Sequence, residues 1–269
     1  MSGWALTLKQ APTLRVDLRG VLPSALAPLT AADVERRPVG LGRSLVPLAE
    51  FFSVAPRADD RLVLAGDLSR FDHVGWQMDG GRLVVEGPVG HYAGGAMKAG
   101  ELRVQGDAGD LAACEMAGGR LEIEGDAGDF VAATLPGSMD GMRGGSVVIR
   151  GNAGARCGDR MRRGTVAVFG DTGDFLASRM VAGTIAVGGR TGSHGGWGMR
   201  RGSVVFAGSA PAAGPGFVPA IAEAGVFWQL LARDLALLGG VFAGLPARAI
   251  VRHRGDLAAE GKGEWIIAR

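Results

Sequence analysis

The sequence predicts a mainly β protein: a right-handed parallel β-helix, or solenoid, of about eight 19-residue coils, with an N-terminal α/β cap and a C-terminal helical extension. The first observation is a set of glycines that each close a short aliphatic run: Gly66, Gly87, Gly106, Gly125, Gly151, Gly170, Gly189 and Gly208. Their spacings are 21, 19, 19, 26, 19, 19 and 19 residues, so a seven-residue insertion lies around "TLPGSMD". Nineteen residues are too few for a strand–helix–strand unit, which needs about 30.

Residues 1–60 do not follow the 19-residue pattern of the repeat and are predicted to cap one end of the solenoid. The segments "LTLKQ" and "LRVDLRG" have the pattern of strands, and "TAADVERRPV" predicts a short helix with Thr30 as its N-cap. The segment "LVPLAEFFSVAP" then leads into the first coil. A cap is expected because the terminal coil of a solenoid leaves an open strand edge and an apolar end.

Residues 61–208 form the predicted β-helix, in which each coil opens with an alternating strand such as "RLVVEG" or "TVAVFG". A period of two puts these aliphatic pairs on one face: Leu83/Val85, Leu102/Val104, Leu121/Ile123, Val147/Ile149, Val166/Val168, Ile185/Val187 and Val204/Phe206. A turn, often "GDxGD", follows each strand. Because phosphate-binding motifs such as G-x-x-x-x-G-K-[ST] and G-x-G-x-x-G are missing, the glycines are interpreted as corners of the scaffold.

Residues 209–269 are predicted to be a helix and a tail that dock on partner subunits. The linker "PAAGPGF" precedes an apolar helix from about Pro219 to Val241, and the tail "RGDLAAEGKGEWII" ends in a strand-like run. Glu223, Arg233 and Asp234 interrupt the apolar segment, which argues against a membrane span. A helix this apolar indicates burial against another subunit.

The composition excludes several classes of partner. A net charge of +2 from 29 basic and 27 acidic residues gives no reason to expect nucleic acid or a membrane surface. Two cysteines, Cys114 and Cys157, are too few for a disulfide framework and are expected to be buried thiols in a reducing cytoplasm. The segment "MSGWALTLKQ" lacks the pattern of a signal peptide, which also favours a cytoplasmic protein.

Residues one period apart stack into columns, so the repeat predicts surface chemistry. A methionine column is expected to fill a corner of the core: Met78, Met97, Met116, Met142, Met161, Met180 and Met199. The next columns gather cations: Lys98, Arg143, Arg160, Arg162, Arg163, Arg179, Arg200 and Arg201. They are either a solvated edge that prevents aggregation or a track for a polyanionic ligand or acidic partner, because stacked guanidinium groups repel unless neutralised.

Other polar columns favour structural roles. The turn carboxylates are expected to make turn hydrogen bonds rather than bind calcium: Asp107, Asp110, Asp126, Asp129, Asp171 and Asp174. His91, Tyr92, His194 and Trp197 lie in the long limbs of their coils and could line a pocket. The sequence lacks H-E-x-x-H and C-x-x-C, so no metal site of the chain's own is predicted, and no catalytic set is nominated.

The repeat and both flanks resemble a known family. The glycine-rich coils are similar to the GXGXG solenoid domain of the glutamate synthase large subunit. The "PLAEFFSV" lead-in, the "GDAGD" turns, the "M-x-x-G" endings and the "GDLAAEGKGE" tail resemble more closely the C-subunit family of formylmethanofuran dehydrogenases, which includes the bacterial formyltransferase/hydrolase complexes. The resemblance covers the whole chain.

The resemblance implies a noncatalytic, structural subunit of an enzyme complex. The implied partners are an amidohydrolase-like hydrolase subunit, a formyltransferase subunit and a fourth subunit similar to the dehydrogenase B subunit. The complex would convert formyl-tetrahydromethanopterin to formate through a methanofuran-type carrier with a glutamate-rich tail. The eight cations named above would then hold carboxylates of that tail.

Three alternatives stay open. Composition rich in alanine, glycine and arginine favours the bacterial complex over a molybdenum or tungsten formylmethanofuran dehydrogenase. A free-standing β-helix enzyme acting on polysaccharides would need a catalytic groove and usually an export signal. An ammonia-channel domain would need fusion to amidotransferase halves.

Overall fold

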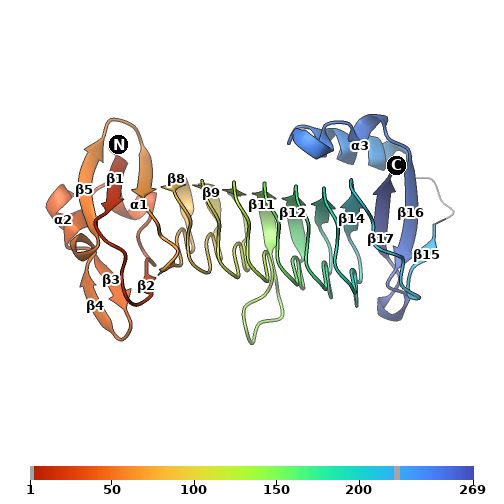
Figure 1. The fold of residues 1–269 in the computed structure, drawn as a ribbon, viewed down its shortest axis with the longest axis horizontal. Helices are drawn as coiled ribbons and strands as arrows, with labels where there is room; N and C mark the ends of the chain where they lie inside the picture. The colour runs from red at the N-terminus through yellow and green to blue at the C-terminus, as the bar shows by residue number, and fades with distance from the viewer. Residues whose placement is uncertain (1–2, 221–224) are drawn as a thin grey trace.

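The computed structural model describes residues 3–220 and 225–269, which form a rod of stacked strands (Figure 1). The N-terminal end contains β1 (Gly3–Leu8), β2 (Val16–Asp17), α1 (Pro23–Leu26), α2 (Ala31–Glu35), β3 (Pro38–Leu41), β4 (Ser44–Pro47) and β5 (Phe52–Arg57). The repeat contains β6 (Arg61–Ala65), β7 (Phe71–Asp72), β8 (Asp79–Glu86), β9 (Ala99–Val104), β10 (Arg120–Ile123), β11 (Arg143–Ile149), β12 (Arg163–Val168), β13 (Thr184–Val187) and β14 (Ser203–Phe206). The C-terminal end contains β15 (Val218–Pro219), α3 (Gly225–Ala236), β16 (Ile250–Gly255) and β17 (Gly263–Ala268), with short 3-10 turns between α3 and β17.

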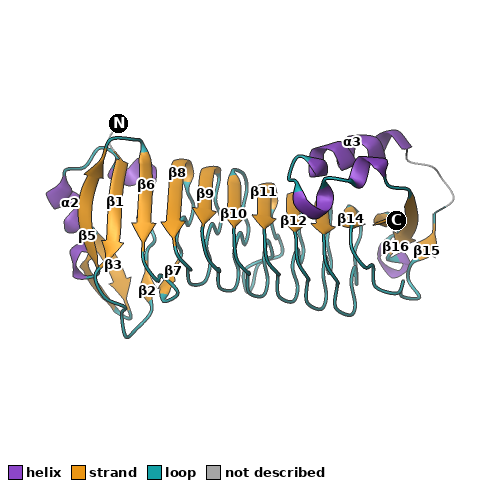
Figure 2. Ribbon diagram, turned by 45° about the horizontal axis from the view of Figure 1, so that its top comes forward, coloured by secondary structure: helices purple, strands orange, loops and turns teal. Residues whose placement is uncertain are grey.

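In the large sheet, β6 pairs in parallel with β8, and from β8 to β14 each strand pairs in parallel with the next one along the chain, so the protein is mainly β as predicted. The short β7 pairs instead with β2 in a separate four-stranded sheet. Leu83 pairs with Leu102 and Leu102 with Leu121, which is the register that the 19-residue period requires. Isolated bridges form a second ladder along the turns, for example Val89 to Ala108 to Ala127. Each repeat therefore adds one strand and one turn to the stack (Figure 2). The handedness and the number of coils stay predictions.

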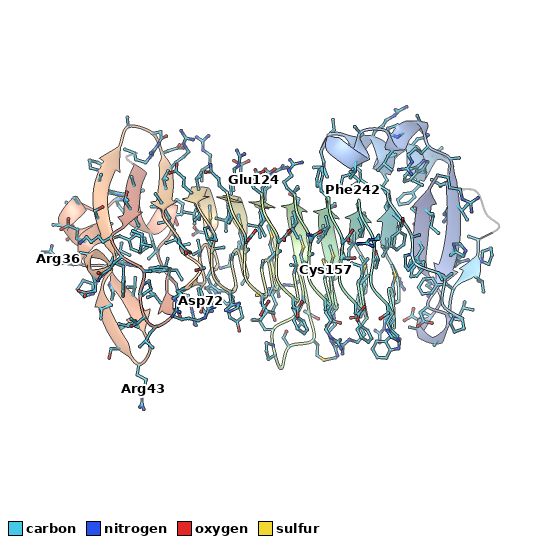
Figure 3. The ribbon with its side chains drawn as sticks, viewed as in Figure 1. Arg36, Arg43, Asp72, Glu124, Cys157 and Phe242 are labelled. Atoms are coloured by element: carbon cyan, nitrogen blue, oxygen red, sulfur yellow. The ribbon has the colours of Figure 1, made fainter. Side chains whose placement is uncertain are left out.

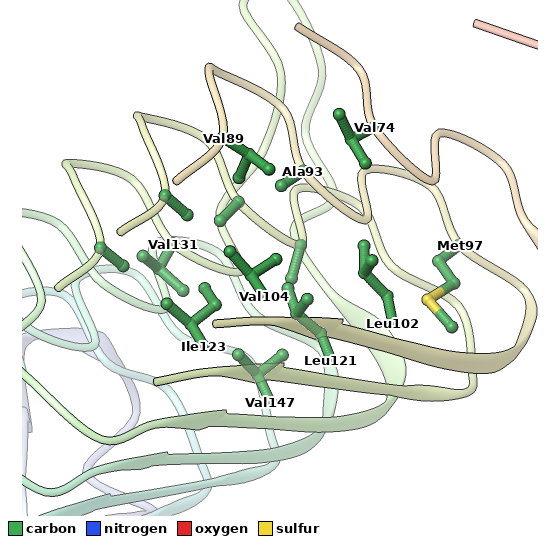
Figure 4. Packing of buried hydrophobic residues seen from close by; sticks show 14 of the residues in the cluster. Val74, Val89, Ala93, Met97, Leu102, Val104, Leu121, Ile123, Val131 and Val147 are labelled. Carbon is green, nitrogen blue, oxygen red and sulfur yellow. The ribbon is translucent and has the colours of Figure 1, made fainter. Parts of the chain in front are cut away.

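The interior is filled by the aliphatic pairs that the alternating pattern predicts. Leu102, Leu121 and Val147 stack one above the other and are at most 1% exposed (Figure 4). The whole predicted methionine column, Met78, Met97, Met116, Met142, Met161, Met180 and Met199, is fully buried. Its interpretation as a flexible filler of the core is confirmed.

The glycines of the turns permit successive coils to lie close together. A Cβ atom at Gly189 would lie 2.2 Å from the Asp171 Oδ1 and 2.6 Å from the backbone of Gly170, a distance that no side chain tolerates. These glycines are corners of the scaffold, as predicted.

The two ends of the large sheet are built differently from its middle. β1 lies between β5, with which it is antiparallel, and β6, with which it is parallel. At the other end β17 pairs in parallel with β14 and antiparallel with β16. Both flanks therefore extend the sheet by non-local pairing. The division into units at residues 60 and 208 stays a prediction.

Two local predictions, one in the N-terminal flank and one in the repeat, are confirmed. Thr30 caps α2 in a capping box, in which its side chain accepts from the Asp33 N–H. Cys114 and Cys157 are free, buried thiols, and burial raises the pKa of each to about 12. Cys157 lies inside the stack of coils (Figure 3).

The helix expected from 219 to 241 is shorter: α3 covers Gly225–Ala236, and residues 221–224 lie outside the described residues. Its inner face packs on this chain's own sheet, because Trp228 and Ala232 share one apolar cluster with Ala167, Ala186 and Val205. Among the described residues, no helix has the length and apolar character that crossing a membrane requires.

Candidate functional site

Seven of the eight predicted cations line one groove on the C-terminal half of the rod. Two adjoining hollows of about 560 and 350 Å³ share Arg162 and Val181 as walls. The arginine groove, as we call the two together, contains Arg143, Arg160, Arg162, Arg163, Arg179, Arg200 and Arg201. Lys98 is exposed in the same column but lines neither hollow.

Backbone hydrogen bonds set the main cation column in register. The N–H groups of Arg143, Arg162 and Arg200 donate to the carbonyl oxygens of the methionines one coil earlier, at 2.7, 2.8 and 2.8 Å. Lys98 makes the same bond to Met78. The predicted column is therefore confirmed. Lys98 is separated from the groove because Ala117 occupies the intervening coil, and two coils span about 10 Å.

The remaining cations come from the positions beside that column. Arg163 begins β12 and is the direct partner, across the parallel pair, of the column residue Arg143, which begins β11. Arg160 and Arg179 are one coil apart and adopt left-handed backbone, with φ of 56° and 54°. That conformation is uncommon for residues other than glycine and recurs here because each coil repeats the same turn.

Three groove arginines already face carboxylates of the chain. Arg179 binds both oxygens of Asp159 at 2.8 Å, and Asp159 is 1% exposed and also accepts from the Ser178 hydroxyl. Because a buried carboxylate needs a partner, Arg179 is committed to the fold. Arg162 pairs with Asp140 at the surface.

The third pair is long, with 4.0 Å between Arg201 and Glu260. Arg143, Arg163 and Arg200 are exposed and have no ion-pair partner among residues 3–220 and 225–269. Like charges on directly opposed strand positions, as at Arg143 and Arg163, repel each other. The groove therefore carries an excess of positive charge, which suits a ligand with several carboxylates.

Two walls of the groove were not predicted. Met139 and Asp140 come from the seven-residue insertion, and the sulfur of Met139 contacts the Arg160 guanidinium at 3.1 Å. Ala258, Ala259 and Glu260 come from the tail between β16 and β17. The spacing of 26 residues pointed to the insertion, but the approach of the tail depends on strand pairing that the sequence pattern does not reveal.

The turn carboxylates take part in hydrogen bonds, as predicted, but with the next coil rather than their own turn. Asp107 accepts from the Asp126 N–H at 2.8 Å, and Asp126 accepts from the Asn152 N–H at 2.7 Å. Asp171 and Asp174 repeat this pattern. In the described part of the chain, no three His, Cys, Asp or Glu side chains gather as a group that could hold a metal ion.

The candidate pocket residues separate into two aromatic clusters. Tyr92 stacks on His73 with centroids 4.6 Å apart, and His194 stacks on Phe175 at 4.8 Å. His194 and Trp197 line a further pocket near the C-terminal end, whereas His91 accepts a hydrogen bond from the Asp110 N–H at 3.0 Å.

Comparisons with known proteins point to one group of complexes. No family model matches the chain. A segment of 76 residues is 42% identical to the C subunit of the formyltransferase/hydrolase complex Fhc of Methylorubrum extorquens, covering 28% of this chain and 29% of that protein. A segment of 99 residues is 29% identical to the C subunit of the tungsten-containing formylmethanofuran dehydrogenase 2 of Methanothermobacter marburgensis, covering 35% and 37%.

A structural comparison extends the similarity to the whole length. A chain in the X-ray crystal structure of the formyltransferase/hydrolase complex (FhcABCD) from Methylorubrum extorquens, solved in complex with methylofuran, superposes with a TM-score of 0.91. It is 39% identical and is matched over 98% of this chain and 99% of that one.

Proposed function

Because the chain belongs to the family of C subunits of the formyltransferase/hydrolase complex, we propose that it is a noncatalytic, structural subunit of such a complex in the cytoplasm. The single observation that carries the proposal is 39% identity with a TM-score of 0.91 over 98% of the chain. The proposed scaffold is a right-handed parallel β-helix of about eight coils, with the units 1–60, 61–208 and 209–269.

The proposed partners are the amidohydrolase-like hydrolase subunit, the formyltransferase subunit and the subunit similar to the dehydrogenase B subunit. Together they convert formyl-tetrahydromethanopterin to formate through a methanofuran-type carrier. Support comes from the similar chain, which belongs to a complex written FhcABCD and crystallised with methylofuran. The alternative is a molybdenum or tungsten formylmethanofuran dehydrogenase, and the matched segments of such C subunits have lower identities, 33% and 29%, against 42% for the Fhc C subunit.

The arginine groove is the proposed binding surface for the glutamate-rich tail of the carrier. Carboxylates form short, often bidentate contacts with guanidinium groups, and Arg143, Arg163 and Arg200 have no carboxylate partner among the described residues. Lys98 would contact the tail only where the tail extends beyond the groove. A tethered tail raises the effective concentration of the formyl-bearing end at the active sites.

The decisive experiment reverses three charges in the groove. Arg162→Glu, Arg163→Glu and Arg200→Glu are combined, and Arg179 is left intact because it neutralises buried Asp159. Native mass spectrometry of the complex purified from its own organism is expected to show unchanged subunits and loss of the carrier mass. Charge-assisted hydrogen bonds contribute about 1.5–3 kcal/mol each, so carrier retention should fall by more than about 100-fold.

A matched control reverses three exposed arginines of the N-terminal end, Arg36, Arg43 and Arg70. Figure 3 shows Arg36 and Arg43 at the end of the rod opposite to the C-terminal half. That control should retain both the partner subunits and the carrier. If the groove variant assembles and keeps its carrier, the arginine groove does not hold the tail. If wild-type chain purifies alone, the structural role itself is wrong, and a molybdenum or tungsten partner would support the dehydrogenase alternative.

A further inference from the structure

A second pocket of about 810 Å³ lies at the C-terminal end of the rod, beyond the last regular coil. Its walls include His194, Trp197, Phe217, Leu257 and Trp265, and residues 211–217 form one side. The pocket is mainly apolar and aromatic, in contrast to the arginine groove. Nothing in the proposed scaffold role uses it.

The pocket lies at the end of a column of stacked side chains. Once per coil, a residue in left-handed backbone points along the same limb, with φ between 58° and 64°: His73, Tyr92, Leu111, Phe130, Arg156, Phe175 and His194. The rings in this column stack face to face: the interplanar angle is 6° between His73 and Tyr92 and 11° between Phe175 and His194. The Arg156 guanidinium lies over Phe175 at 4.6 Å, so a planar cation takes the place of a ring in its coil.

His194 is the last member of this column, and only one of its faces is covered. Phe175 stacks on one face with centroids 4.8 Å apart, which matches the spacing of parallel strands. Among the described residues no ring stacks on the other face, because the chain after β14 leaves the stack and passes around the pocket. The space next to His194 is therefore the position that the following ring of the column would occupy.

The edge of that position has an aromatic wall. Trp197 meets Phe175 edge-on at 6.3 Å and 86°, as Trp76 meets Tyr92 at 6.3 Å and 81° in the N-terminal stack. Trp197 is 52% exposed, which is unusual for so large an apolar side chain. The indole N–H of Trp265, also in the wall, is buried and has no hydrogen-bond partner in the described part of the chain.

The pocket joins the arginine groove. Ala258 belongs to the walls of both, and Gly198 of the groove directly follows Trp197 of the pocket. The Asp256 carboxylate fixes this junction, because it accepts from the Gly198 N–H at 3.1 Å and from the Ala258 N–H at 3.0 Å. An aromatic position and a set of unpaired cations are thus contiguous.

We propose that this pocket binds a flat aromatic ring that is joined to a chain of carboxylates. The ring stacks on the open face of His194 beside Trp197, and the carboxylates extend past Ala258 into the arginine groove. The second half of this statement rests on the proposed function of the groove. The pocket is then an aromatic extension of the arginine groove on the same subunit.

The test compares two synthetic ligands that differ only in the ring. N-benzoyl-tetraglutamate and N-acetyl-tetraglutamate are titrated into the full chain by calorimetry. Stacking of a ring on an aromatic side chain is expected to make the benzoyl ligand on the order of ten-fold tighter. Trp197→Ala and, separately, His194→Ala should reduce that advantage to less than about two-fold while leaving the affinity of the acetyl ligand unchanged.

Two further measurements separate the possible outcomes. Trp76→Ala, the counterpart of Trp197 in the N-terminal stack, should keep the full advantage. N-benzoylglycine, which has the ring and one carboxylate, should quench tryptophan fluorescence of the wild type and not of Trp197→Ala.

Equal affinity of the two tetraglutamates would overturn the aromatic pocket and leave the arginine groove standing. Binding of N-benzoylglycine without binding of N-acetyl-tetraglutamate would support the pocket and overturn the groove. If none of the three ligands binds, both the aromatic pocket and the arginine groove are wrong as binding sites. His194 and Trp197 are both exposed, so their variants are expected to fold.

Discussion

At the scale of single residues, the turn carboxylates bind one coil to the next. Asp174 Oδ1 accepts from the Ser193 N–H at 2.7 Å and from the Ser193 hydroxyl at 2.9 Å. The hydrogen bond from the Ser193 N–H and, to a smaller extent, the one from the Ser193 hydroxyl hold the pKa of Asp174 below its usual value of 3.8. A lowered pKa in the folded state means that the carboxylate stabilises the fold above about pH 3.8, and that this contribution is lost as the pH falls through the lower folded value.

This linkage can be tested with two variants that cannot titrate at position 174. Asp174→Ala removes the acceptor, so the urea midpoint at pH 7 should fall, whereas Asp174→Asn keeps an amide oxygen and should fall less. Asn152 already plays this part in the chain, since its Oδ1 accepts from the Asp171 N–H at 2.8 Å. Urea denaturation measured at neutral pH and at about pH 2.5 checks the prediction.

In acid the wild type should lose stability relative to Asp174→Asn, because only the carboxylate can be protonated. A gap between wild type and Asp174→Asn that is the same at both pH values would contradict the assignment of the pKa to the coil-to-coil bond.

Most residue-level predictions depended on the period alone, and for that reason they succeeded. Leu102, Leu121 and Val147 stack as the spacing requires, and Met142 falls in the methionine column despite the insertion before it. The repeat period does not predict which side chains form ion pairs. The commitment of Arg179 to Asp159 joins two coils through side-chain conformations that no spacing specifies.

At the scale of elements, the insertion between Ala133 and Gly141 forms a wall of the arginine groove. Figure 1 shows this segment as a loop that projects from the stack. Met139 is 66% exposed, and Asp140 pairs with Arg162. Asp140 of this loop therefore forms an ion pair with an arginine that a ligand would otherwise contact.

Deletion of Thr134–Asp140 should restore a 19-residue coil, because Ala133 and Gly141 then take the places of Cys114 and Glu115 one coil earlier. The chain should fold, since the removed segment is outside the regular pairing. Freeing Arg162 should strengthen the binding of N-acetyl-tetraglutamate by about two- to five-fold, the size of one exposed ion pair. Asp140→Asn is the control that removes the carboxylate and keeps the loop.

Calorimetry with both variants tests this role. Equal gains would assign the effect to the Asp140 charge, and a larger gain for the deletion would add a steric contribution of the loop. No gain in either variant would mean that Asp140 does not compete with the ligand at Arg162.

The position of α3 shows where element prediction from sequence ends. The apolar helix was recognised, but it packs on β12, β13 and β14 of its own chain. The sequence does contain a sign of this contact at the outward-facing strand positions. Ala167, Ala186 and Val205 stand at the repeat position that the charged Arg103 has in an earlier coil. The apolar pattern of the helix does not identify these strand positions as its partner, because the contact joins segments about 20 to 70 residues apart.

At the scale of the whole molecule, the C-terminal end of the rod carries an apolar surface that is exposed among residues 3–220 and 225–269. The outer face of α3 exposes Val226 to 79% and Leu230 to 60%, and Leu237, which directly follows the helix, is 87% exposed on the same surface, while the inner face of α3 is buried on the sheet. The surface lies above the C-terminal coils (Figure 2). A helix that is apolar on both faces indicates two layers of contact, of which the chain itself supplies one.

We expect this outer face to contact another subunit of the complex. Leu230→Glu combined with Leu237→Glu should leave the thermal stability of the chain within about 0.5 kcal/mol of wild type, because both side chains are solvent-exposed here. Assembly should fall by more than about ten-fold, since two charges would be buried in an apolar contact. Leu14→Glu with Leu45→Glu is the matched control, because these leucines are 57% and 74% exposed at the opposite end.

Co-purification of the tagged chain with its partner subunits, quantified against circular dichroism melting curves of the chain alone, measures both effects. A variant that melts normally and still recovers every partner would show that the outer face of α3 remains in solvent. Loss of partners in both the α3 variant and the control would instead assign assembly to the chain's net charge. Selective loss in the α3 variant would make the C-terminal end of the rod an assembly surface, adjoining the side on which the arginine groove gathers its cations.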